Sequence, residues 1–102
     1  MDAEAFVKVK ILYFGSVRAA IGKSEEYMEI APDITVHRLL EKLAGIYGEG
    51  LREEIFDGDG ASLRDDLMIT LNEAVIAREK LAGTGLKQGD NLALYPIFPG
   101  GG

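Results

Sequence analysis

One run of apolar residues with helical spacing, over residues 36–47, most constrains what this chain can fold into. The apolar positions recur every three or four residues and so share one helix face: Val36, Leu39, Leu40, Leu43, Ile46 and Tyr47. Asp33 or Thr35 can cap the start of this helix, and Gly45, Gly48 and Gly50 are expected to end it. A single amphipathic helix cannot bury its apolar face alone, so other segments must supply an apolar surface.

Segments with the two-residue alternation of β-strands supply that surface. In residues 6–14, FVKVKILYF, lysines mark one face as exposed, yet this face turns apolar at Leu12 and Phe14. The opposite face is entirely apolar and carries Val7, Val9, Ile11 and Tyr13. Further strands are predicted over 25–30, 66–72 and 91–97, with a short one within 72–77. The sequence therefore predicts a two-layer α+β domain with about five strands on one main helix.

Composition excludes several classes of function. The chain has 102 residues, no cysteine and one histidine, which argues against disulfides, thiolate metal sites, iron–sulfur clusters and multi-histidine metal sites. Its net charge is −6 without a basic block, so we expect no nucleic acid partner. Neither a membrane-length apolar stretch nor a leader is recognisable, and we expect no membrane partner and a cytoplasmic location.

Candidate catalytic and metal motifs inside the chain fail on spacing. DGDG at 57–60 resembles the opening of a calcium loop, but Met68 stands where the bidentate glutamate should be. Adjacent acids such as Glu53 and Glu54 point in different directions on any regular element. His37 lies at the edge of the helical stripe and is expected to be a partly exposed surface residue. We predict no metal site and no self-sufficient catalytic centre.

The last eight residues, YPIFPGGG, are an unusual way to finish a fold, because glycine loses more conformational entropy on ordering than any other residue. Glycines can thread a narrow channel in a partner, and Pro96 and Pro99 would stiffen the approach. A terminal carboxylate is a poor electrophile and needs activation by another protein, for instance by adenylation. The alternative is a frayed terminus without a role.

Four segments in order carry a resemblance to a known family: KILYFGSVRAAIG, DITVHRLLEKL, LMITLNEAVIA and LKQGDNLALYPIFPGGG. They resemble the MoaD family of ubiquitin-like β-grasp sulfur carriers, which are the small subunits of molybdopterin synthase. The resemblance covers nearly all of residues 7–102 and implies a mixed sheet, a β-grasp domain over 1–98 and a flexible tail over 99–102. The tail departs from the family pattern, because Ile97 replaces a second proline and a third glycine is added.

The family resemblance implies a chemistry for the tail. An E1-like enzyme would use ATP to adenylate Gly102, and sulfur would replace one oxygen to give a thiocarboxylate. The large subunit of molybdopterin synthase would then use this sulfur to build the dithiolene of molybdopterin from cyclic pyranopterin monophosphate. Pro99, Gly100 and Gly101 would thread into the partner, and the chain itself would bind no cofactor.

The resemblance also implies a docking surface for both partners, made of Leu12, Phe14, Val75 and Tyr95, with Arg18 at its edge. Three alternatives share the predicted fold: a thiamin-pathway carrier, a tRNA-thiolation carrier and a ubiquitin-like modifier that conjugates to lysines. An alternative of another class is a non-catalytic protein-interaction module.

Overall fold

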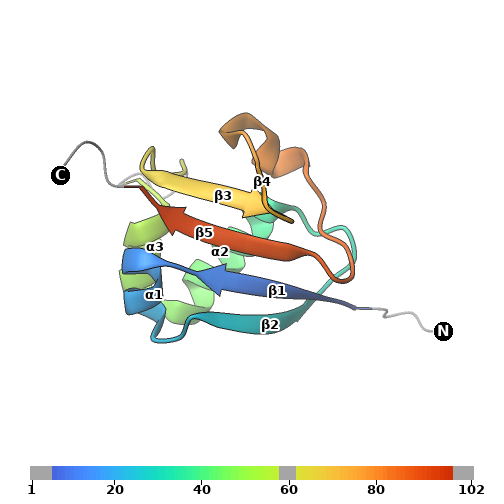
Figure 1. Cartoon of the computed structure of the whole chain (residues 1–102), viewed down its shortest axis with the longest axis horizontal. Coiled ribbons are helices and arrows are strands. Elements are labelled where there is room, and N and C mark those ends of the chain that lie inside the picture. The colour runs from blue at the N-terminus through green and yellow to red at the C-terminus, as the bar shows by residue number, and fades with distance from the viewer. Residues whose placement is uncertain (1–5, 58–61, 98–102) are drawn as a thin grey trace.

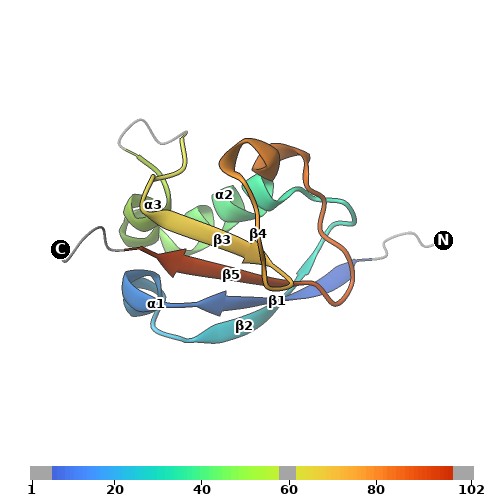
Figure 2. The same cartoon turned by 45° about the horizontal axis from the view of Figure 1, so that its top comes forward.

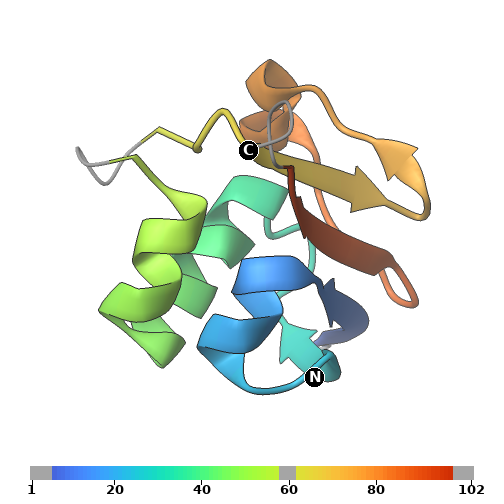
Figure 3. The same cartoon turned by 60° about the vertical axis from the view of Figure 1, so that its left-hand side comes forward.

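The computed structural model describes residues 6–57 and 62–97, which form a sheet with helices on one face (Figure 3). The strands are β1 (Val7–Tyr13), β2 (Glu25–Ile30), β3 (Leu67–Leu71), β4 (Ala74–Val75) and β5 (Asn91–Pro96). The helices are α1 (Gly15–Ile21), α2 (Val36–Tyr47), α3 (Glu49–Ile55) and the 3-10 helix η1 (Arg78–Gly83).

The sheet has the order β2-β1-β5-β3-β4. β1 and β5 are parallel, whereas the other neighbouring pairs are antiparallel, and Figure 1 looks onto the sheet with α2 behind it. The predicted mixed sheet of five strands on one main helix is therefore confirmed. Because β5 lies in the centre of the sheet and runs parallel to β1, both strands end on the same side of the molecule.

The residues that flank helix α2 explain where it begins and ends. The Thr35 side chain accepts a hydrogen bond from the Arg38 backbone N–H at 3.2 Å, and Gly48 ends the helix with a φ of +89°. The prediction that Gly45 helps to end the helix is wrong, since Gly45 lies inside it. The prediction of a buried Ile46 is also wrong: Ile46 is 54% exposed, and the buried face of α2 includes Ala44 in its place.

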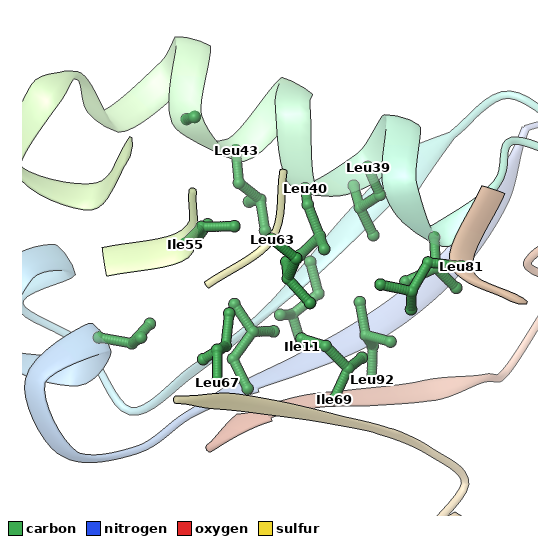
Figure 4. Packing of buried hydrophobic residues seen from close by; sticks show 14 of the residues in the cluster. Ile11, Leu39, Leu40, Leu43, Ile55, Leu63, Leu67, Ile69, Leu81 and Leu92 are labelled. Atoms are coloured by element: carbon green, nitrogen blue, oxygen red, sulfur yellow. The ribbon is translucent and has the colours of Figure 1, made fainter. Parts of the chain in front are cut away.

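The core lies between α2 and the inner face of the sheet. Leu39, Leu40 and Leu43 of α2 point toward residues of the strands, among them Ile11 and Leu92 (Figure 4). The predicted inner face of β1 is confirmed, because Val9, Ile11 and Tyr13 are buried and Val7 packs against the core. All these side chains except the Tyr13 hydroxyl are apolar, so the hydrophobic effect accounts for the packing of the two layers.

Two core residues come from a segment that the sequence pattern left unassigned. Leu81 of η1 and Leu86 after it are both buried. η1 lies beside the start of α2, and the Thr84 carbonyl accepts a hydrogen bond from the Val36 N–H at 2.9 Å (Figure 2). A 3-10 helix of six residues is too short to show an apolar period, so only the tertiary structure reveals this part of the core.

A polar cluster joins β1, β2 and α2 at one side of the core. Oε2 of Glu26 accepts hydrogen bonds from the hydroxyls of Tyr13, at 2.5 Å, and Tyr47, at 2.6 Å, and Lys23 Nζ lies 3.4 Å from Oε1. Burial alone would raise the pKa of Glu26, but these hydrogen bonds outweigh it and hold the pKa below its ordinary value. Burial raises the pKa of Tyr13, and the bond to Glu26 adds to the shift.

Candidate docking face and base of the tail

The outer face of the sheet, turned away from α2, holds four of the five predicted docking residues. Strand register places them in two rows. One row crosses the sheet from β4 to β1 and consists of Val75, Thr70, Ala93 and Leu12. The next row consists of Met68, Tyr95 and Phe14, of which Phe14 lies one residue beyond β1. We call these seven residues the docking face.

Phe14 and Tyr95 form the centre of the second row. Their rings stack with centroids 4.4 Å apart and an interplanar angle of 9°. The Phe14 N–H donates to the Leu94 carbonyl at 3.2 Å, and the Phe14 carbonyl accepts from the Arg18 N–H at 3.2 Å. The structure therefore brings Phe14 and Tyr95 into direct contact and places the exposed Arg18 one helical turn beyond them.

Val75 lies apart from the other predicted docking residues. It is separated from Leu12 by three strand spacings, or roughly 14 Å. Between them is a hollow of about 200 Å³ with the small side chains of Thr70 and Ala93 in its lining. Lys10, Glu73 and Asn91 also line it and make it partly polar. Sequence reasoning missed these five residues, although the alternation of β5 does place Ala93 on the same face as Tyr95.

The chain leaves the sheet at a well-held point beside the docking face. The Ile97 N–H donates a 2.7 Å hydrogen bond to the Asp66 carbonyl. The Asp66 carboxylate accepts two hydrogen bonds from the Arg64 guanidinium, at 2.9 and 3.0 Å, and these hold the pKa of Asp66 below its ordinary value. The C-terminal end of β5 is thus tied to the domain as far as Ile97.

Gly15 makes the close approach of α1 to the end of β5 possible. Its φ is +56°, and a Cβ at this position would lie 3.3 Å from Cγ of Pro96. A larger residue would therefore meet both an unfavourable backbone conformation and the proline ring. The predicted tail residues that follow, Pro99, Gly100, Gly101 and Gly102, lie outside the described residues.

Other candidate chemistry is weak in the part of the chain that the structure describes. His37 is partly exposed, with Nδ1 3.6 Å from Oε2 of Glu41 and its ring edge-on to Phe56, which agrees with the predicted surface role. Within residues 6–57 and 62–97, no three acidic or histidine side chains are arranged to hold a metal ion. In the same residues, no helix is long and apolar enough to cross a bilayer.

Comparison with known proteins decides the family. The family model described as the ThiS family matches residues 11–101, which include the end of β1, all later strands and helices, and two of the three terminal glycines. The chain belongs to the ThiS family. As a ThiS-family protein it is a ubiquitin-like sulfur carrier or modifier, and such proteins work with E1-like activating enzymes. No curated protein sequence matches the chain.

Several solved structures have a fold similar to that of this ThiS-family chain. SAMP1 from Haloferax volcanii is 26% identical with a TM-score of 0.77, and the match covers 92% of this chain and 99% of that one. The small archaeal modifier protein 1 from Methanosarcina acetivorans is 27% identical, with a TM-score of 0.76 and coverages of 96% and 100%. A candidate molybdopterin converting factor, subunit 1, from Pyrococcus furiosus is 28% identical, with a TM-score of 0.68 and coverages of 90% and 99%.

These matches confirm the predicted ubiquitin-like β-grasp fold and the sulfur-carrier family. They include both a modifier and a candidate molybdopterin converting factor, so the MoaD assignment within the larger family stays a prediction. The roles of the docking face and of Gly102 stay predictions as well.

Proposed function

We propose that this ThiS-family protein carries sulfur as a thiocarboxylate on Gly102 and donates it for the synthesis of molybdopterin. The observation that carries the proposal is the family match through residue 101, because it extends beyond the folded domain into the glycine tail. The 28% identity to the Pyrococcus furiosus molybdopterin converting factor candidate supports the choice of molybdopterin. The protein is then the small subunit of a synthase and is not an enzyme by itself.

The chemistry requires two steps on the carboxyl group of Gly102. First, a carboxylate oxygen attacks the α-phosphorus of ATP, which gives an acyl-adenylate and releases pyrophosphate. Second, a sulfide nucleophile attacks the acyl carbon and expels AMP, which retains the oxygen that was bound to phosphorus. The product is a thiocarboxylate. Its sulfur then bonds to the acceptor as a thioester, and water cleaves the acyl C–S bond, which leaves the sulfur on the acceptor and regenerates the carboxylate of Gly102. ATP is thus a substrate of the activating enzyme and not a cofactor of this chain.

The described geometry suits a protein that presents a tail to other proteins. Ile97 is fixed by its hydrogen bond to Asp66, so the residues beyond it start from a defined position. The stacked Phe14 and Tyr95 lie on the adjacent face and offer a rigid aromatic contact. An E1-like enzyme and the large synthase subunit would both need the same tail, so they must bind one after the other.

A second candidate function is that of a protein modifier joined to lysines through Gly102. It is favoured by the identities of 26% and 27% to two archaeal modifier proteins. Both candidates share the acyl-adenylate and differ in the nucleophile that attacks it, which is sulfide in one and a lysine amine in the other.

The decisive experiment follows the mass of the intact chain. We expect incubation with an E1-like adenylating enzyme of the same organism, ATP and sulfide to exchange one oxygen for sulfur, and digestion to localise the change to the C-terminal peptide. The chain should then restore molybdopterin synthesis in cells that lack the small synthase subunit. Lysine-linked adducts in cell extract, without restoration of molybdopterin synthesis, would select the modifier. No mass change with an enzyme that activates other carriers would contradict both.

A further inference from the structure

A second hollow lies at the outer edge of the sheet, close to the point where the chain leaves β5. β4 pairs only with Thr70 and Leu71 of β3, so the hollow opens beside the earlier part of β3. Its volume is about 310 Å³. Most of its walls are apolar and come from β3, β4, the residues before η1 and the residue after β5: Leu67, Met68, Ile69, Val75, Ile76 and Ile97. We call it the edge hollow.

Two of its wall residues are large apolar side chains that the domain leaves uncovered. Val75 is 65% exposed and Ile97 is 45% exposed. Single exposed apolar residues are common on proteins, but apolar residues that gather around a concave site mark a binding surface. The edge hollow meets this second description, because both side chains border the same depression.

The edge hollow is continuous with the docking face and with the base of the tail. Val75 belongs to the first row of the docking face, and Met68 lies opposite Tyr95 in the second row. Ile97 is the last residue before the segment that carries the proposed chemistry. A protein that encloses the residues after Ile97 must approach Ile97 itself, and the edge hollow lies within its reach.

We infer that the edge hollow receives one aliphatic or aromatic side chain of the E1-like enzyme that takes the tail, an inference that rests on the proposed function. A small polar ligand fits less well, since ligand sites hold several convergent polar groups. Among the described residues that line the edge hollow, Arg78 is the one charged side chain, and its Nη1 is paired with Asp65 at 2.8 Å. An apolar side chain would cover Val75 and Ile97 without leaving a polar group unpaired.

The test is a substitution at the rim of the edge hollow that introduces a large side chain to fill it. Ala77 lines the hollow, is exposed, and has the extended φ and ψ of −64° and 142°, so phenylalanine can replace it without backbone strain. The matched control is Ala82→Phe, at an exposed position of η1 that does not line the hollow. We expect Ala77→Phe to raise the Kd for the E1-like enzyme at least tenfold and Ala82→Phe to change it less than twofold. Both variants should keep the wild-type unfolding midpoint.

Methyl NMR of the unmodified chain gives an independent readout. Titration with the E1-like enzyme should shift or broaden the methyl signals of two residues that line the edge hollow, Ile69 in β3 and Ile76 directly after β4. Unchanged signals from both, while those of Leu12 respond, would overturn the inference. Wild-type affinity of Ala77→Phe would overturn it too, even if the enzyme loads sulfur on the wild-type chain. A wild-type chain that neither binds the enzyme nor gains sulfur would instead contradict the proposed function, and the inference would fall with it.

Discussion

Replacing Tyr95 by glutamate should separate partner binding from folding. Tyr95 lies on the face of the sheet away from α2, and its main described contact is the stacked ring of Phe14, 4.4 Å away. Loss of an aromatic pair removes about 0.5–1.5 kcal/mol beyond the area buried. Domains of this size are stable by about 5–15 kcal/mol, so Tyr95→Glu should remain folded with a slightly lower urea midpoint. Phe14→Glu should behave in the same way.

The effect on binding should be much larger. If a partner covers Tyr95, the new carboxylate is buried against an apolar surface without a counter-charge. An unpaired buried charge destabilises by about 3–5 kcal/mol. Because 1.4 kcal/mol corresponds to a factor of about ten, the Kd for the E1-like enzyme should rise roughly a hundredfold or more in isothermal titration calorimetry.

Tyr27 offers a matched control on the same face of the sheet. It lies opposite Lys10, is 63% exposed, and its ring centroid is 6.0 and 5.8 Å from the ammonium groups of Lys8 and Lys10. Tyr27→Glu should change stability by less than about 0.5 kcal/mol and leave affinity unchanged. The reasoning would be refuted if Tyr95→Glu bound like the wild type, or if Tyr27→Glu weakened binding as much.

Further variants test the core, the polar cluster and the tail. Leu40→Ala should lower the free energy of unfolding by about 2–5 kcal/mol in urea melts, whereas the exposed Lys42→Ala should change it by less than about 0.5 kcal/mol. The pKa of Glu26 is lowered in the folded protein, so its carboxylate stabilises the fold above its ordinary pKa of 4.5, and this stabilisation is lost as pH falls through the folded pKa. Glu26→Gln should therefore flatten the acid part of a curve of unfolding free energy against pH, measured by circular dichroism. Deletion of Gly102 should reduce but not abolish sulfur transfer measured by mass spectrometry, because Gly101 then carries the terminal carboxyl group and the tail regains the two-glycine ending of the family pattern. Deletion of both Gly101 and Gly102 should abolish sulfur transfer with an unchanged unfolding midpoint.

Much of the candidate site could be predicted from sequence because it lies on regular strands. The alternation of residues 6–14 and 91–97 assigns Phe14 and Tyr95 to the outer face, and register then brings their rings together. The hollows could not be predicted in this way. They depend on side-chain size across neighbouring strands and on the shortness of β4, and both follow from strand pairings between segments far apart in sequence.

The sequence by itself determined the helices and strands in which apolar residues recur often enough for the spacing to be recognised. Alternation fixed the inner face of β1, and helical spacing fixed most of the buried face of α2. Only the tertiary structure decided that Ala44 is buried instead of Ile46, since that choice depends on which side of α2 the neighbouring elements cover. It also decided that Leu81 completes the core, because a six-residue 3-10 helix is too short to show an apolar period and is held in place by the elements it packs against.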